Sequence, residues 1–430
     1  MKIAMIGAGY VGLTSGAVFA DLGNTVWVVR RDAGKIEKLK KGIIPIHEPG
    51  LAAIVKRNVK AGRLIPTTKY EECVPFADVV FIAVGTPDGK NGADLTQVYT
   101  AAAEIARNLK SGYTVVVDKS TVPPGTADEV TAILNKYKKK GAKFDVVSSP
   151  EFLRQGNAVE DTTKPNRVVI GSASKKATVL LVKLHTPLKC PIVITNVRSA
   201  EVIKYTANAY LSMRIGFIDQ IANLCEKMGA DINDIIRGIG LDKRIGLHYW
   251  WVGMGYGGYC FPKDVKALAA LFDKVGERDN LFRKLDQLND DRAERFAKKT
   301  EKALGSLKGK TIGVLGLSSR PDTDDIRGSV PVNFIRELLK LGAKVRAHDP
   351  MAQENARREM GDTVAYFPDP YSLAKGVDGL CVVTEWPHFK KLDLTKIRKL
   401  MKGKLLLDSK NVYSPERVRK LGFTYLPTGR

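Results

Sequence analysis

Apolar and polar positions follow two different rhythms along this chain. Near both ends, short apolar runs alternate with longer amphipathic stretches, the pattern typical of buried parallel strands joined by helices. The apolar runs are Lys2–Ile6, Val26–Val29, Val79–Val84, Thr114–Val117 and Phe144–Val147 in the first part, and Thr311–Leu317, Lys344–Ala347, Gly379–Val383 and Lys404–Leu407 in the last. The pattern predicts an α/β protein with a doubly wound, Rossmann-like sheet at each end.

The middle of the chain has a helical period instead. From Asn196 to Met228 apolar residues recur every three or four positions, which predicts one long helix with a broad apolar face. Further helices are expected at Ile232–Ile239, Val265–Leu271 and Leu281–Leu304. We therefore expect three domains: two sheet domains, 1–196 and 306–430, bridged by the long helix of a small all-helical domain, 197–305.

The first apolar run leads directly into Gly7-Ala8-Gly9-Tyr10-Val11-Gly12, and a helical pattern follows to Leu22. A G-x-G-x-x-G sequence between a strand and a helix is the fingerprint of a dinucleotide site. Gly7 would make the tight turn, Gly9 would let a pyrophosphate approach the backbone, and Gly12 would allow close helix packing. The phosphates would lie at the helix N-terminus, so we predict a dinucleotide site here.

The residue after the second predicted strand is unusual for such a site. An acidic residue normally stands there and accepts hydrogen bonds from the adenosine ribose. This chain has Arg30 and Arg31, with Asp32 beyond them. A guanidinium cannot accept from a ribose hydroxyl, but it binds a phosphate well. Taken alone, this substitution predicts NADP.

Three polar residues stand after successive strands of the first sheet: Thr86, Thr121 and Glu151. Open parallel sheets bind their ligands at these carboxyl ends, so the three residues are candidates for ligand contacts. The alternative is that each of them only caps a helix.

The stretch Met254–Asp264, MGYGGYCFPKD, carries the strongest sign of chemistry. Its glycines let the backbone approach a ligand, and Pro262 stands where it can open the next helix. Cys260 would therefore lie at a helix N-terminus and beside Lys263, and both features favour a thiolate. We predict that Cys260 is a nucleophile; the alternative is a buried structural cysteine. Of the other cysteines, apolar or helical sequence surrounds Cys73, Cys225 and Cys381.

A dinucleotide site and a nucleophilic cysteine together indicate a particular oxidation. The thiol can hold an aldehyde as a thiohemiacetal, whose oxidation gives a thioester, and water then releases a carboxylate. Lys204 and Asn208, one helical turn apart, would stabilise the oxyanions, although by spacing alone both could be surface residues. Asp264 would hold a water or a proton near Lys204, and Glu151 would assist hydrolysis.

The amino-acid composition limits the classes of partner that this protein is expected to bind. The 430 residues are 44% hydrophobic and 27% charged, as in ordinary globular proteins, and the five cysteines have neither disulfide nor zinc spacing. The formal charge of +23 would suit a protein that binds nucleic acid. The basic residues are spread along the chain, however, and no aromatic residues alternate with them to stack on bases. No apolar run reaches membrane-spanning length and no signal-peptide core is visible. We expect a cytoplasmic protein with no metal, no nucleic-acid partner and no membrane association.

Several of these motifs, in their order and spacing, resemble the UDP-glucose 6-dehydrogenase family over essentially the whole chain. They are Gly7–Gly12, Glu151–Gly156, Lys204 with Asn208, Gly255–Asp264 and Thr323–Arg327. The resemblance implies NAD-dependent oxidation of UDP-glucose to UDP-glucuronate by two hydride transfers, through a cysteine thiohemiacetal and a thioester. It also implies an N-terminal NAD-binding domain, a central domain that dimerises through the long helix, and a C-terminal UDP-sugar-binding domain.

The resemblance also assigns roles to single residues. Catalysis would fall to Cys260, Lys204, Asn208, Asp264, Glu151 and Thr121. By the resemblance, the cofactor would contact Val11, Lys35, Thr86, Thr121, Glu151, Lys263 and Arg327. The glycine fingerprint and the position after the second strand add Gly7, Gly9, Tyr10, Gly12 and Arg30 as cofactor contacts. UDP-glucose would contact Glu151, Phe152, Leu153, Lys204, Asn208, Arg244, Tyr249, Trp250, Trp251, Val252, Gly253, Gly257 and Arg320, with Arg244 reaching a partner subunit's site.

The chain departs from the family pattern at Ser149, Tyr259 and Ser319-Arg320, where the family usually has Asn, Ser and Phe-Lys. Trp250 and Trp251 are also bulkier than usual. These differences bear on sugar specificity, so the same chemistry on GDP-mannose remains an alternative. An alternative of another class is a nucleotide-sugar-binding protein without catalysis. Arg30 favours NADP, but the family that this chain resembles usually uses NAD. We therefore expect NAD to be the cofactor and NADP to be accepted as well.

Overall fold

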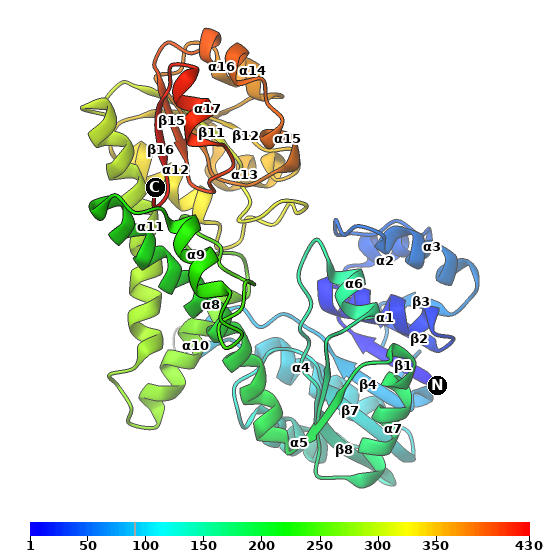
Figure 1. The fold of residues 1–430 in the computed structure, drawn as a ribbon. Coiled ribbons are helices and arrows are strands. Elements are labelled where there is room, and N and C mark those ends of the chain that lie inside the picture. The colour runs from blue at the N-terminus through cyan, green and yellow to red at the C-terminus, as the bar shows by residue number, and fades with distance from the viewer. Residues whose placement is uncertain (90–91) are drawn as a thin grey trace. The chain divides into compact units, whose positions relative to one another are not determined.

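The computed structural model describes residues 1–89 and 92–430, and these residues form two compact units, Met1–Ala207 and Asn208–Arg430. Helix α8 (Val197–Met228) is continuous across the boundary between the units (Figure 1). No helix in the described part of the chain is long and apolar enough to cross a membrane.

The first unit is built on a sheet with the strand order β10-β9-β8-β7-β4-β1-β2-β3. Its strands are β1 (Lys2–Ile6), β2 (Thr25–Val29), β3 (Leu64–Thr67), β4 (Val79–Ile82), β7 (Gly112–Asp118), β8 (Ala142–Ser148), β9 (Val168–Gly171) and β10 (Ile192–Thr195). All neighbouring strands are parallel except β8 and β9. The central strands are buried on both faces, which is why they read as continuous apolar runs.

The helices of this unit lie on both faces of the sheet (Figure 1). They are α1 (Tyr10–Asp21), α2 (Ala33–Lys40), α3 (Leu51–Lys60), α4 (Thr96–Asn108), α5 (Thr126–Tyr137), α6 (Ala158–Thr163) and α7 (Lys175–His185), with short 3₁₀ turns at Val74–Phe76 and Thr186–Leu188. A small hairpin, β5 (Asp88–Gly89) and β6 (Gly92–Ala93), precedes α4.

The second unit begins with helices. After α8 come α9 (Ile232–Gly240), α10 (Phe261–Lys274) and α11 (Leu281–Leu304). Local residues determine where three of these helices begin. Asp231 and Asn280 cap α9 and α11 with side-chain oxygens, and Pro262 stands in the first turn of α10.

The second sheet has the order β13-β12-β11-β14-β15-β16, and all its neighbours are parallel. Its strands are β11 (Thr311–Leu315), β12 (Lys344–His348), β13 (Val364–Tyr366), β14 (Gly379–Val382), β15 (Leu405–Asp408) and β16 (Thr424–Pro427). Its helices are α12 (Val330–Lys340), α13 (Gln353–Met360), α14 (Pro370–Ala374), α15 (Pro387–Lys390), α16 (Leu394–Leu400) and α17 (Pro415–Lys420), with a 3₁₀ turn at Gly361–Thr363.

The α/β class, the two doubly wound sheets and the helical middle are confirmed. The predicted central strands agree with the structure to within two residues at either end, and α11 has the predicted bounds. The sequence analysis missed β3, β9, β10, β13 and β16. These strands lie at or near the sheet edges, and β3 and β16 each contain a proline, which edge strands tolerate.

Candidate active site

The glycine turn after β1 has the geometry that a dinucleotide needs. Gly7 has φ +116°, and a Cβ there would lie 2.2 Å from the carbonyl oxygen of Ala83. A Cβ at Gly12 would lie 2.0 Å from the carbonyl oxygen of Gly7, so both positions admit only glycine. A Cβ at Gly9 would meet nothing within 4 Å. Gly9 is also the N-cap of α1 and has no side chain of its own to stand between the start of the helix and a pyrophosphate.

Arg30 turns back toward this glycine turn. Its Nη1 donates to the carbonyl oxygen of Ala8 at 3.0 Å. Asp32 caps α2 by accepting from the backbone N–H of Lys35 at 3.0 Å, and the Lys35 ammonium lies 3.7 Å from the same carboxylate. The acidic side chain nearest the expected ribose position therefore already has partners within its own turn.

Thr86 and Thr121 lie together at the carboxyl ends of neighbouring strands. The hydroxyl of Thr86, which is buried, donates to the carbonyl oxygen of Thr121 at 3.0 Å. Thr121 is half-buried, and Ser120 before it donates to the carbonyl oxygen of Val84 at 2.9 Å. These bonds fix the ends of β4 and β7 against each other. Thr86 therefore has a structural partner, and its role as a ligand contact stays a prediction.

Glu151, Lys204 and Phe152 form a buried cluster in the first unit. The Lys204 ammonium lies 3.9 Å from Glu151 Oε1 and 5.2 Å from the centre of the Phe152 ring. The other carboxylate oxygen accepts from the backbone N–H of Leu153 at 2.5 Å. Burial raises the pKa of Glu151, and the charge of Lys204 opposes that shift. Lys204 and Asn208 are both buried, so neither is a surface residue of α8.

Cys260 is exposed and is the N-cap residue of α10, the helix start that the sequence predicts. Its loop lies against the loop that follows β11: the N–H of Gly258 donates to the carbonyl oxygen of Gly328 at 3.2 Å. A Cβ at Gly257 would lie 2.6 Å from that same oxygen. Cys73, Cys225 and Cys381 are buried, as predicted, and Cys190 is partly exposed.

A basic residue near the thiol comes from the C-terminal sheet domain. The Arg327 guanidinium lies 4.0 Å from the centre of the Tyr259 ring and is held by a bidentate pair with Asp325, at 2.8 and 2.6 Å. Burial opposes its charge, but Asp325, Tyr259 and the Cys260 thiol raise the pKa of Arg327. A guanidinium near a thiol favours the thiolate, so Arg327 is a candidate group for activating Cys260. The sequence analysis assigned Arg327 to the cofactor and did not connect it with Cys260.

A buried ion pair holds the start of the cysteine loop. The N–H of Gly253 donates to Asp219 Oδ1 at 2.8 Å, and Arg292 lies 3.3 Å from the same oxygen and also donates to the carbonyl oxygen of Gly253. Burial raises the pKa of Asp219 to about 6, against the charge of Arg292. Asn289 then fixes Tyr256 by bonds to its backbone N–H and carbonyl oxygen. The sequence analysis found none of these supports.

Asp264 has other partners than the expected water near Lys204. Its two carboxylate oxygens accept from Asn208 Nδ2 at 2.5 Å and from Lys263 Nζ at 2.6 Å, and all three side chains are buried. The structure therefore joins Asn208, Asp264 and Lys263 in one hydrogen-bonded group. The Lys263 ammonium, predicted to favour the thiolate, donates to this carboxylate.

The predicted substrate loop is aromatic and partly open. Tyr249 has φ +69° and stacks on Trp251 with ring centres 4.1 Å apart, while Trp250 donates to the carbonyl oxygen of Gly246. Val252 is buried, and half of the Trp251 side chain is exposed. Arg244 is almost fully exposed and pairs with Asp242. Arg320 is half-buried beside Ser319, whose buried hydroxyl has no hydrogen-bond partner among the described residues.

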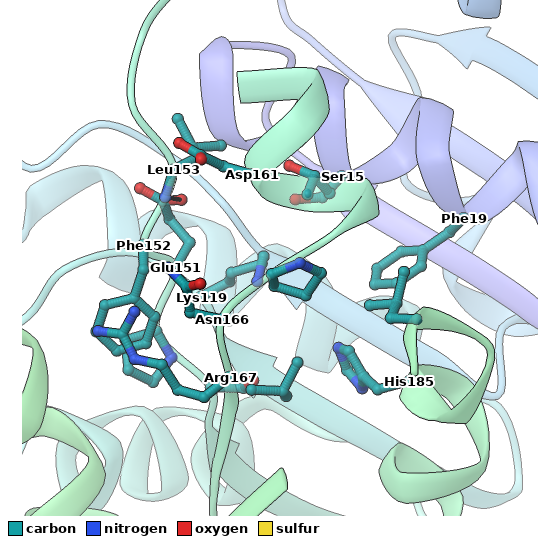
Figure 2. A pocket seen from close by; sticks show the side chains of 16 residues that line it. Ser15, Phe19, Lys119, Glu151, Phe152, Leu153, Asp161, Asn166, Arg167 and His185 are labelled. Atoms are coloured by element: carbon teal, nitrogen blue, oxygen red, sulfur yellow. Dashed lines mark hydrogen bonds between the residues drawn. The ribbon is translucent and has the colours of Figure 1, made fainter. Parts of the chain in front are cut away.

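A cavity of the first unit adds residues that the sequence analysis did not single out. It lies around Glu151 and is lined by Lys119, Asn166, Arg167 and His185, among others (Figure 2). The Arg167 guanidinium lies 3.5 Å from the centre of the Phe152 ring. Nothing in the local sequence distinguishes these residues from ordinary helix and loop positions, because only the fold brings them to Glu151.

The strand order and the open glycine turn of the first sheet are those of a dinucleotide-binding oxidoreductase. The chain belongs to the UDP-glucose/GDP-mannose dehydrogenase family: the models of its NAD binding, central and UDP binding domains match residues 1–189, 198–291 and 313–415. NAD is therefore its cofactor.

Named relatives match along the whole chain. The UDP-glucose 6-dehydrogenase TuaD of Bacillus subtilis (strain 168) is 44% identical over 430 residues, covering 100% of this chain and 93% of the relative. The UDP-glucose 6-dehydrogenase of Rhizobium meliloti (strain 1021) is 46% identical and is covered completely, as is this chain. Among solved structures, a UDP-glucose dehydrogenase from the hyperthermophilic archaeon Pyrobaculum islandicum has a TM-score of 0.93 at 37% identity, covering 100% of this chain and 97% of its own.

Proposed function

We propose that this chain oxidises UDP-glucose to UDP-glucuronate with NAD, through a covalent intermediate on Cys260. The observation that carries the proposal is the exposed Cys260 at the start of α10, with the charge of Arg327 acting on it, in a chain whose first sheet ends in an open dinucleotide turn. The names of the relatives support UDP-glucose as the substrate.

NAD, when bound, takes up the electrons of both oxidations. The pyrophosphate would rest at the start of α1, beside Gly9, and the proposal is supported by the space around Gly9, where a Cβ would meet nothing within 4 Å. The other cofactor contacts that we propose are Gly7, Tyr10, Val11, Arg30, Lys35, Thr86, Thr121, Glu151, Lys263 and Arg327. We also propose that NADP is accepted, because Arg30 lies at the turn and no carboxylate stands in its place.

The chain's own groups carry the covalent chemistry. The C6 alcohol first loses a hydride and a proton to become an aldehyde. The Cys260 thiolate then attacks the aldehyde carbon to give a thiohemiacetal, which loses a second hydride and a proton to become a thioester. Lys204 and Asn208 would donate to the oxyanions that form at C6, and Thr121 would assist. In the last step a water oxygen attacks the thioester carbon, the carbon–sulfur bond breaks, and the thiol is released with the carboxylate.

Glu151 is the proposed base for that last step. It is the carboxylate next to Lys204, and burial raises its pKa, which makes it a better proton acceptor than an exposed glutamate. Asp264 is the proposed support for Asn208, because it accepts from that amide and so fixes which way the amide points.

The proposed contacts with UDP-glucose are those of the resemblance. They are Glu151, Phe152, Leu153, Lys204, Asn208, Arg244, Tyr249, Trp250, Trp251, Val252, Gly253, Gly257 and Arg320. Arg244 would serve a partner subunit, which agrees with its exposure in a single chain.

We also propose a homodimer formed through α8, in a cytoplasmic protein with the three domains 1–196, 197–305 and 306–430. Tyr210, Phe217 and Leu224 are half exposed and seven residues apart, and Met228 extends the row with 73% exposure. A spacing of seven keeps such side chains on one face of a helix, and coiled helices pair through a face of this kind. A Phe217→Glu variant that still sediments as a dimer would contradict this interface.

The test of the function is NADH formation by the purified chain with UDP-glucose, followed together with UDP-glucuronate. We expect two NADH for each acid. A ratio of one would contradict the thioester route. Faster oxidation of GDP-mannose than of UDP-glucose would favour that alternative, and binding of UDP-glucose without any NADH would favour a non-catalytic binding protein.

A further inference from the structure

Lys119 is a buried lysine that the proposed reaction does not yet use. It follows β7 directly, and its backbone N–H donates to the carbonyl oxygen of Ile82 at 3.0 Å, so its position is fixed by the sheet. The residue is 8% exposed. Within residues 1–89 and 92–430, its ammonium group has no hydrogen-bond or ion-pair partner. A buried, unpaired ammonium is costly, so a purely structural role would be better filled by an apolar side chain.

The side chain of Lys119 lines the cavity around Glu151 (Figure 2). About 70 Å³ of this cavity is open to the centres of water molecules. Its lining includes Ser149, whose hydroxyl is buried and has no hydrogen-bond partner among the described residues. A polar cavity of this size, with unpartnered donors, is the kind that holds ordered water. Water in this space would connect the ammonium of Lys119 with the carboxylate of Glu151.

The charges around Glu151 come from several elements. Lys204 on α8 is 3.9 Å away, and Arg167, before β9, is stacked on Phe152. Asp161 on α6 also faces the carboxylate, but it forms a bidentate pair with Arg154, at 2.9 and 2.7 Å.

His185 on α7 lines the same cavity. Its Nδ1 lies 2.8 Å from the carbonyl oxygen of Leu181, and burial, together with the charge of Lys119, lowers the pKa of His185 to about 4. It is therefore uncharged near neutral pH. In the described part of the chain, the basic groups that face Glu151 are Lys204, Arg167 and Lys119. Burial lowers the pKa of Lys119, and the charge of Glu151 opposes that shift.

We propose that Lys119 is a positioning residue that keeps the Glu151 carboxylate charged, acting through water held in the cavity that they share. The role of Glu151 as base rests on the proposed function, but the coupling of the two charges does not. Burial raises the pKa of Glu151, and the charges of Lys204 and Lys119 lower it. Loss of the Lys119 charge should therefore raise the pKa of Glu151, and the carboxyl should take up its proton at a higher pH.

The direct test is an infrared titration of the whole protein without substrate. The carboxyl band of Glu151 is identified as the band that Glu151→Gln removes, and its titration is compared in the wild type, Lys119→Met and Lys119→Arg. We expect the midpoint in Lys119→Met to move up by about one pH unit, the low end of the effect of a nearby charge, and Lys119→Arg to restore it. Lys143→Met, which removes an exposed lysine from β8, is the matched control and should leave the midpoint unchanged.

Activity gives a second readout. The acid limb of the kcat profile should move upward by the same amount in Lys119→Met, with the KM for UDP-glucose unchanged and the thermal midpoint not lowered. An unshifted carboxyl band in Lys119→Met, or an equal shift in Lys143→Met, would overturn the proposal. If Lys119→Met does not fold, Lys119→Gln removes the same charge with a polar side chain. A wild type that forms no NADH with UDP-glucose would remove the proposed function, while the infrared result would still decide the coupling.

Discussion

The two sheets have the same order of central strands, yet they use the position after their second strand in opposite ways. In both, the first strand ends in a glycine with positive φ, Gly7 at +116° and Gly316 at +107°. In the first sheet the second strand is followed by Arg30, which donates to the carbonyl oxygen of Ala8. In the second sheet it is followed by Asp349, which accepts from the N–H of Leu317 at 2.8 Å. Ala8 and Leu317 each stand directly after the glycine of their own turn.

The difference extends to the helix that follows. In the first sheet α1 starts three residues after Gly7, and its N-cap residue Gly9 makes no side-chain cap. In the second sheet a long loop separates Gly316 from α12, and Asp349 also accepts from the N–H of Met351, the N–H of Ala352 and the indole N–H of Trp386. The same topology thus presents Arg30 beside the glycine turn of the first sheet, while Asp349 of the second sheet is occupied by internal hydrogen bonds. Arg30 should therefore matter mainly for function, and Asp349 mainly for stability.

The largest expected effect on stability is that of Asp349→Ala. It leaves four N–H donors, three of them buried, without their acceptor, and each buried donor left unsatisfied costs about 1–3 kcal/mol of unfolding free energy. Arg30→Ala, the same position in the first sheet, should cost less than about 1 kcal/mol because it removes one bond of a partly exposed side chain. Urea unfolding measures the unfolding free energy of both variants. Equal losses of unfolding free energy would contradict the proposed difference between the two sheets.

Lys204→Ala should lower kcat by about 10²-fold or more, because an oxyanion donor acts mainly in the transition state. Its unfolding free energy should fall less than that of Asp349→Ala, and KM for UDP-glucose should change little. Steady-state kinetics and urea unfolding on the same preparation check this. Lys143→Ala, an exposed lysine of the same unit, is the control. A rise in KM alone would make Lys204 only a binding residue.

A smaller effect is expected from Arg30→Asp. An aspartate there can accept from the ribose hydroxyls and repels a 2′-phosphate, so the ratio of kcat/KM for NAD to that for NADP should rise. The expected size is roughly 1–3 kcal/mol, the scale of one charged hydrogen bond. The four values of kcat/KM are measured at fixed salt. If the wild type already excludes NADP, Arg30 only donates to the carbonyl oxygen of Ala8 and does not determine cofactor preference.

Local sequence was sufficient for much of the fold. Gly7, Gly9 and Gly12 place the first turn because only glycine fits the first and last of these positions, and the periodic pattern of Leu281–Leu304 is long enough to fix both ends of a helix. The edge strands β3 and β16 were missed, because a four-residue segment that contains proline looks like a loop unless its neighbour in the sheet is known.

Less of the candidate active site than of the fold could be predicted from the sequence. Cys260 could be chosen by its local setting, whereas the spacing of Lys204 and Asn208 alone did not distinguish them from surface residues. The partners that define the chemistry of these residues are distant in sequence. Glu151 reaches Lys204, and Asp264 reaches Asn208, only after folding. Nothing in the local sequence distinguishes Lys119 and Arg167, because their importance comes from a cavity that five separate segments of chain enclose.

The most direct test of the central claim is to trap the covalent intermediate on Cys260. In Glu151→Gln the thioester should form but hydrolyse slowly, so acid quenching after mixing with UDP-glucose and NAD should give protein whose mass has increased by one oxidised sugar nucleotide. Peptide mapping should place the added mass on Cys260, and the double variant Glu151→Gln with Cys260→Ser should show none. Absence of the adduct in Glu151→Gln while NADH still forms, or its location on the partly exposed Cys190, would contradict the account.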